Sequence, residues 1–280
     1  MKPRVGGNGL GLAGEGHWQV SVYSSRKTTV RHGTDQLHLF FLNLAAAIFF
    51  TLVGGPDYLV IYFASGLFHL AMELLLAFTG GRKGDVFVYG RKLPKSAHSV
   101  LRAFVEGPGI CVPAFYAADR LFVGDTWPGL LVPAALMGVA ALYSGLADYL
   151  ALRRLEDGEG VVWSRRKMTR PFVVMTVAFV GTTCLILVML MPEPHRTHAI
   201  IYLIAYTALT MLWFLINYAF GVRMIQRFDE ERQEFYTPGI GFELVAFFYD
   251  SANEMALLIS PVYLIPYAAR WLQFATILQP

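Results

Sequence analysis

The chain has 280 residues, of which 55% are hydrophobic and 15% are charged, whereas a water-soluble domain carries about 25% charged residues. Its apolar residues fall into blocks of about 20, long enough to cross a hydrocarbon core about 30 Å thick as an α-helix. This composition excludes a water-soluble fold. The net charge of +3 does not indicate a nucleic-acid partner, because the Lys and Arg residues lie between the apolar blocks, where membrane orientation explains them.

The first segment, residues 1–36, is polar and rich in glycine, which predicts a flexible N-terminal tail. It is too long to be the charged start of a signal peptide, so we expect it to be retained. Residues 37–280 hold long apolar stretches that predict a seven-helix transmembrane domain, and therefore an all-α polytopic membrane protein. The seven predicted spans are 37–54, 58–79, 97–123, 130–152, 171–191, 198–221 and 242–269.

Basic residues alternate between the two ends of these spans. Of the 23 Lys and Arg residues, 19 fall in the tail and in the second, fourth and sixth connections. Because cytoplasmic loops are enriched in Lys and Arg, this alternation predicts a cytoplasmic N-terminus and an external C-terminus. We expect an integral protein of the bacterial inner membrane or an equivalent membrane.

We single out polar side chains within five of the predicted spans, because an ionisable group inside hydrocarbon costs about 2.5–3.5 kcal/mol even on a lenient scale. They are His69 and Glu73 in the second span, Arg102, Glu106 and Asp119 in the third, Asp148 in the fourth, Asn217 in the sixth, and Asp250, Asn253 and Glu254 in the seventh. Counted from the span midpoints, one group in each of the five spans lies about 6–11 Å toward the cytoplasmic side. These five groups are Glu73, Glu106, Asp148, Asn217 and Asp250. Asp119 lies near the outer end beside Arg120, which predicts an interfacial ion pair.

Two interpretations of this polar layer are open. Each side chain taken alone could merely bridge helices. As a set, however, four carboxylates at one depth would repel one another unless some were protonated, and a protonated carboxyl in an apolar pocket can donate a proton. The layer therefore favours a functional cavity, in which deep aromatic side chains such as Trp213 and Tyr249 could stabilise carbocations.

The sequence lacks the residues that several kinds of chemistry require. No lysine follows Lys167, which excludes a retinal Schiff base in the last span. No HExxH motif is present, and His195 and His198 are expected in an outer loop. We therefore predict no metal site and no cofactor.

The segment Gly66-Leu-Phe-His69-Leu-Ala-Met-Glu73 resembles the second helix of the emopamil-binding sterol isomerases. In that family a glutamate follows in the next helix, and Glu106 matches it here. The resemblance implies a double-bond isomerase that moves a proton on a sterol-like skeleton with these residues. That family has five helices and an Asn-Trp pair in its last helix, for which this chain has no clear equivalent.

A second resemblance is to the integral-membrane terpene cyclases of meroterpenoid and drimane-type pathways. These are small seven-helix proteins with a glutamate in the second helix and an aspartate in the last, positions matched here by Glu73 and Asp250. The resemblance implies that these two acids cyclise a polyprenyl chain through carbocations.

Our leading hypothesis is therefore a terpene cyclase that takes a lipophilic isoprenoid substrate from the bilayer. Asp250 or Glu73 would protonate an alkene or epoxide, and Glu106 or His69 would take the final proton. Substrate binding and orientation of the acids are assigned to Asn217, Asn253, Glu254, Asp148, Trp213 and Tyr249. The alternatives are a sterol-type double-bond isomerase, a proton-coupled transporter and a non-catalytic membrane subunit.

Overall fold

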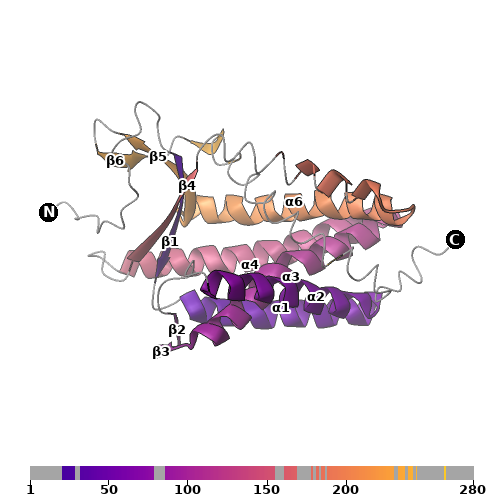
Figure 1. The fold of residues 1–280 in the computed structure, drawn as a ribbon, viewed down its shortest axis with the longest axis horizontal. Helices are drawn as coiled ribbons and strands as arrows, with labels where there is room; N and C mark the ends of the chain where they lie inside the picture. The colour runs from indigo at the N-terminus through magenta and orange to yellow at the C-terminus, as the bar shows by residue number, and fades with distance from the viewer. Residues whose placement is uncertain are drawn as a thin grey trace.

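The computed structural model describes residues 21–28, 32–78, 86–154, 161–168, 178, 181–182, 184–186, 188–229, 233–236, 239–241, 244 and 262. Most of these residues belong to long helices that lie roughly side by side (Figure 1). The predicted span 242–269 lies outside the described residues except at positions 244 and 262. The structure describes no other residue of this last predicted span.

The helices coincide with the predicted apolar stretches. They are α1 (His32–Gly54), α2 (Asp57–Phe78), α3 (Lys95–Phe122), α4 (Thr126–Arg154) and α6 (His195–Ala219). Among the described residues, α1, α2, α4 and α6 each contain a segment long and apolar enough to cross a membrane. The described positions between 178 and 189, within the predicted span 171–191, are also helical. A mainly helical membrane protein is thereby confirmed.

Helix α3 is the central helix of the described bundle. It packs against α1, α2, α4 and α6, and every residue from 111 to 119 is buried. It carries more charged residues than its neighbours, which is why it is less apolar overall. Because the surrounding helices cover it, these charges can face protein rather than lipid.

Helices α2 and α3 approach each other closely through glycines. A Cβ atom on Gly107 would lie 2.9 Å from the backbone oxygen of Ser65, and a Cβ on Gly66 would meet the ring of Phe104 at 2.5 Å. Small residues of this kind allow helix backbones to approach in membrane proteins. The close contact lies about one turn from His69, and it brings the polar residues of the two helices into range of each other.

Four strands form an antiparallel sheet at one end of the helices, which we call the sheet end (Figure 1). They are β1 (Ser21–Thr28), β4 (Val161–Met168), β5 (Arg223–Asp229) and β6 (Glu234–Tyr236), in the order β4-β1-β5-β6. Strand β1 pairs with β4 over its whole length, from Ser21 opposite Met168 to Thr28 opposite Val161. The all-α prediction missed this sheet because its strands lack a regular alternation of apolar and polar residues.

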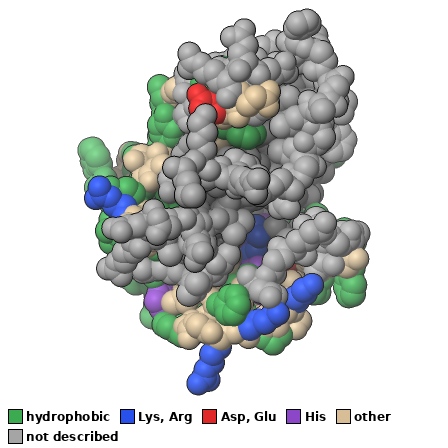
Figure 2. Space-filling view, turned by 90° about the vertical axis from the view of Figure 1, so that its left-hand side faces the viewer, with side chains coloured by type: hydrophobic (Ala, Val, Ile, Leu, Met, Phe, Trp, Pro, Cys, Tyr) green, Lys and Arg blue, Asp and Glu red, His purple; other side chains and the backbone are tan. Residues whose placement is uncertain are grey.

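The connection between α2 and α3 contains a two-residue hairpin, β2 (Phe87–Val88) and β3 (Arg91–Lys92). Its turn residues have positive φ, 47° at Tyr89 and 76° at Gly90, as tight hairpin turns require. Tyr89 fixes the hairpin to α1, because its amide donates to Thr34 Oγ1 at 2.9 Å and its hydroxyl lies 2.5 Å from His38 Nε2. Viewed from this end, several Lys and Arg side chains project from the molecule (Figure 2).

Candidate functional site

Four ionisable side chains meet where α2 and α3 face each other. His69 and Glu73 lie one turn apart on α2, and Arg102 and Glu106 lie one turn apart on α3. Arg102 Nε is 2.8 Å from Glu106 Oε1 and 3.4 Å from Glu73 Oε1. His69 Nε2 is 3.6 Å from Glu106 Oε2. We call these four residues the acid–base cluster.

Burial differs among the members of the acid–base cluster. The side chain of Glu73 is 3% exposed, whereas those of Arg102, His69 and Glu106 are 14%, 17% and 29% exposed. Glu73 is therefore enclosed, while the contact between His69 and Glu106 lies nearer the surface of the described structure.

Arg102 changes the electrostatics expected from the sequence. The carboxylates of Glu73 and Glu106 share its guanidinium group, so their mutual repulsion is offset by a positive charge between them. With neutral His69 the acid–base cluster carries a net charge of −1, and protonation of His69 makes it neutral. The positive charge of a protonated His69 is thus compensated by the negative charge of the acid–base cluster.

Helix α1 supports α3 beside Glu106. The side chain of Asn43 donates from Nδ2 to the carbonyl of Val105 at 3.0 Å, and Gly109 leaves the space that Asn43 occupies. Pro108, which follows soon after Glu106, has no amide proton and cannot complete the helical hydrogen-bond pattern. The contact from Asn43 therefore holds the backbone where the proline weakens it.

Three members of the acid–base cluster have the residue types of a metal site. His69, Glu73 and Glu106 each offer one ligand atom, and these atoms lie within 4.8 Å of one another. Arg102 contacts both carboxylates, however, and a cation at the same position would be repelled by its guanidinium group. The donor set fits ion pairing with Arg102 better than it fits a metal ion.

The structure brings together three of the four residues predicted to be catalytic, namely His69, Glu73 and Glu106. The fourth, Asp250, lies outside the described residues, as do Tyr249, Asn253 and Glu254. Asp148 on α4 and Asn217 on α6 are buried. Asn217 donates from Nδ2 to the carbonyl of Trp213 at 2.8 Å, one turn earlier on its own helix, and Trp213 packs against the core.

Arg102 was missed as a site residue. The sequence contained the signal, because an arginine in an apolar stretch requires a counter-charge and Glu106 stands four residues later on the same helical face.

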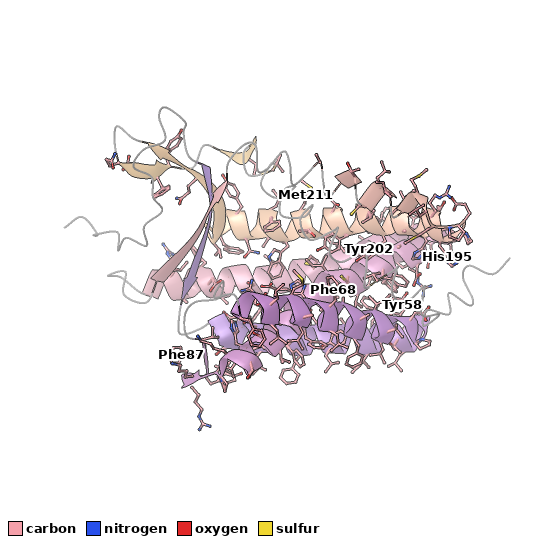
Figure 3. The ribbon with its side chains drawn as sticks, viewed as in Figure 1. Tyr58, Phe68, Phe87, His195, Tyr202 and Met211 are labelled. Carbon is pink, nitrogen blue, oxygen red and sulfur yellow. The ribbon has the colours of Figure 1, made fainter. Side chains whose placement is uncertain are left out.

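A second buried network, which we call the Asp119 network, joins three helices far from the sheet. Tyr58 of α2 donates its hydroxyl proton to Asp119 Oδ2, and His198 Nε2 of α6 is 2.7 Å from Asp119 Oδ1. Tyr58 and His198 are fully buried. Figure 3 shows Tyr58 and His195 at the end of the bundle opposite to Phe87 of the hairpin.

The predicted interfacial pair of Asp119 with Arg120 was wrong. Consecutive helical residues point in directions about 100° apart, so Asp119 turns inward to His198 while Arg120 reaches Asp125 at 3.8 Å. The outer-loop prediction for His198 was also wrong, because α6 begins at His195 and places His198 one turn inside the helix. The rings of Phe115 and Phe122 pack beside it.

No protein-family model matches the chain, and no curated protein or solved structure matches it at a significant level. The resemblances to terpene cyclases and to sterol isomerases therefore stay predictions based on a few residues.

Proposed function

We propose that the protein is a membrane-embedded terpene cyclase that moves protons on an isoprenoid lipid. The observation that carries this proposal is the acid–base cluster of His69, Glu73, Arg102 and Glu106, held between helices in an apolar bundle. Ionisable groups are expensive in such a place and are usually retained for function. A histidine–carboxylate pair is a common device for general acid–base catalysis.

In this proposal each residue has a distinct role. Asp250 donates the first proton to an alkene or epoxide, as the resemblance to terpene cyclases implies, because Glu73 is already paired with Arg102. Carbon–carbon bonds then form through carbocations. Glu106, assisted by His69, removes a proton from the final cation, so the product is an isomer of the substrate. Arg102 and Glu73 position Glu106.

The seven-span topology is also part of the proposal. Strand β1 is hydrogen-bonded to β4 and to β5, and paired strands outside a bilayer lie on one side of it. The chain must then cross the bilayer an even number of times between any two of these strands. The four helices α1 to α4 lie between β1 and β4, and the predicted span 171–191 and α6 lie between β4 and β5, which fits this requirement. The predicted span 242–269 adds the seventh crossing. The basic residues at the sheet end favour a cytoplasmic N-terminus, in a bacterial inner membrane or its equivalent.

A sterol-type double-bond isomerase is the second candidate. It is favoured by the grouping of His69, Glu73 and Glu106 in one cluster, since these are the residues that the resemblance to sterol isomerases assigns. Isomerisation adds a proton at one carbon and removes another proton from a carbon nearby. These three residues could perform both transfers without Asp250.

The test is mass-spectrometric detection of products from membranes that contain the protein. The substrates are farnesyl- and geranylgeranyl-bearing compounds, their epoxides, and sterols with one ring double bond. A cyclised product of unchanged mass that is lost in both Asp250→Asn and Glu106→Gln supports the cyclase. Asp125→Asn, in an exposed turn, is the control and is expected to retain activity.

Other outcomes separate the alternatives. A rearranged sterol whose formation survives Asp250→Asn but not Glu106→Gln assigns the isomerase instead. If the folded protein converts none of these substrates, the catalytic proposal fails and a non-catalytic membrane subunit becomes the better explanation.

A further inference from the structure

One face of α2 carries polar side chains along most of the helix. They recur every three or four residues, so they lie on one side of the helix. The residues are Tyr58, Tyr62, Ser65, His69 and Glu73. Four of them are buried and His69 is half-buried. We call this set the polar face of α2.

The polar face of α2 is turned toward α3 throughout. At one end Tyr58 binds Asp119, and at the other end Glu73 lies beside Arg102. Between them, the ring of Tyr62 packs against Phe104 with centroids 5.5 Å apart, and the backbone of Ser65 meets Gly107. From Tyr58 to Glu73 the face extends about 22 Å, which is most of the thickness of a hydrocarbon core of about 30 Å.

The two ends of this interface have the same chemistry. His198 pairs with Asp119 at one end and His69 lies beside Glu106 at the other. Each pair joins an imidazole to a carboxylate, the two kinds of side chain that most often carry protons in general acid–base chemistry. Among the described residues, Arg120 and Tyr116 on α3 and His195 on α6 are further ionisable groups near the Asp119 network.

Tyr62 lies between the two pairs. Its hydroxyl oxygen is buried, and within the part of the chain that the structure describes it has no hydrogen-bond partner. A buried hydroxyl in that situation is costly, and is usually satisfied by water. A hydroxyl can donate and accept at the same time, so Tyr62 and a water beside it can pass a proton along the face.

We propose that the interface of α2 and α3 conducts protons between the Asp119 network and the acid–base cluster, with waters bridging the gaps between side chains. Protonated His198 gives its Nε2 proton to Asp119 Oδ1. The neutral carboxyl group then rotates so that this same proton points at the Tyr58 hydroxyl, which accepts it and releases its own proton toward Tyr62. His69 or Glu106 accepts the proton at the far end. Only protons move, so no oxidant or reductant is required.

This inference goes beyond the proposed enzyme activity and does not depend on it. A cyclase needs a single buried site, whereas two titratable pairs joined by hydroxyl groups across most of the bundle can transfer protons from one side of a membrane to the other. The transport role would then belong to the same helix pair that carries the acid–base cluster.

The experiment uses the full-length protein in phosphatidylcholine–phosphatidylglycerol liposomes that contain the pH-sensitive dye pyranine. A potassium gradient with valinomycin drives proton entry. The wild-type protein is expected to acidify the lumen faster than protein-free liposomes do. Tyr62→Phe keeps the ring and removes only the hydroxyl, and it is expected to lose the flux above the protein-free level. Tyr206→Phe, at a fully buried position on α6, is the matched control and should retain it.

Asp119→Asn provides a second, independent variant, because an amide keeps the shape of the carboxyl but cannot relay a proton. It is also expected to lose the flux, and thermal unfolding of each purified variant checks that it is folded. The proposal is overturned if wild-type and protein-free liposomes acidify equally, if Tyr62→Phe conducts like the wild type, or if Tyr206→Phe lowers the flux as much as Tyr62→Phe. Product formation, assayed with equal pH on both sides, should be unaffected by Tyr62→Phe, so failure of this proposal and failure of the cyclase proposal are distinguishable.

Discussion

At the scale of single residues, Arg102 determines whether the acid–base cluster can exist. Its guanidinium group contacts two carboxylates that would otherwise face each other in a largely buried space. The sequence predicted His69, Glu73 and Glu106 because each interrupts an apolar stretch. It could not predict the pairing of Asp119 with His198, since these residues are 79 positions apart and only the packing of α3 against α6 brings them together.

Replacement of Arg102 tests this dependence. Arg102→Met keeps the length of the side chain and removes the charge, which leaves Glu73 and Glu106 without their shared cation. We expect the free energy of unfolding to fall by about 3–5 kcal/mol, as for a broken buried ion pair. Denaturant-induced unfolding in detergent micelles measures this change.

A double variant serves as the internal control. Glu106→Gln in the Arg102→Met background removes one of the two uncompensated carboxylates and should recover part of the lost stability. If Glu106→Gln lowers the stability of the Arg102→Met variant by as much as it lowers that of the wild type, the two residues are not coupled.

Proton transfer by the acid–base cluster leads to a second prediction at this scale. Glu106→Gln removes the proposed proton acceptor while it retains a hydrogen-bonding side chain of the same size. The turnover number should fall by about 10²–10⁴-fold, the usual range for loss of a general base. A change in KM with an unaltered turnover number would instead assign Glu106 to substrate binding.

At the scale of elements, the close contact of α2 with α3 sets the geometry of the site. It depends on Gly107, whose missing side chain leaves room for the backbone of Ser65. The sequence predicted where these helices begin and end, because long apolar stretches determine that. It did not predict which pair of helices would approach most closely, because glycines are frequent in membrane helices generally.

Gly107→Ala tests this contact. The added methyl group would lie 2.9 Å from a backbone oxygen, so the helices must separate and the acid–base cluster must loosen. We expect a loss of about 1–3 kcal/mol in unfolding free energy, as for overpacking elsewhere, together with reduced activity. Gly138→Ala on α4 is the matched control, because a Cβ there meets no atom within 4 Å.

The control should be neutral or slightly stabilising, since alanine favours a helix over glycine by about 0.5–1 kcal/mol. Equal effects of the two substitutions would show that helix propensity, and not the contact between α2 and α3, determines the response.

At the scale of the whole molecule, the sheet and the hairpin lie at one end of the bundle and the Asp119 network lies at the other (Figures 1 and 3). Apolar stretches and basic residues predicted the helices, since both reflect the bilayer directly. The sheet was not predicted, because its strands come from the N-terminal tail and from two separate connections, and each acquires partners only in the folded chain.

Cysteine labelling tests the orientation of the two ends. In a variant that lacks Cys111 and Cys184, Glu193→Cys lies before α6 and Lys92→Cys lies in the hairpin, both at exposed positions. A membrane-impermeant maleimide added to intact cells should label Glu193→Cys and should label Lys92→Cys only after lysis. Labelling of both from the same side contradicts the proposed topology.

The pairing of β1 with β4 and β5 has a consequence for biosynthesis. Strand β1 ends at Thr28, whereas β5 begins at Arg223. A ribosome that adds roughly 5–20 residues per second needs roughly 10–40 s to complete the intervening chain. During that interval β1 has an unpaired edge, which is the kind of surface that joins neighbouring nascent chains. The nascent protein must therefore keep this first strand shielded until the sixth predicted span has been synthesised.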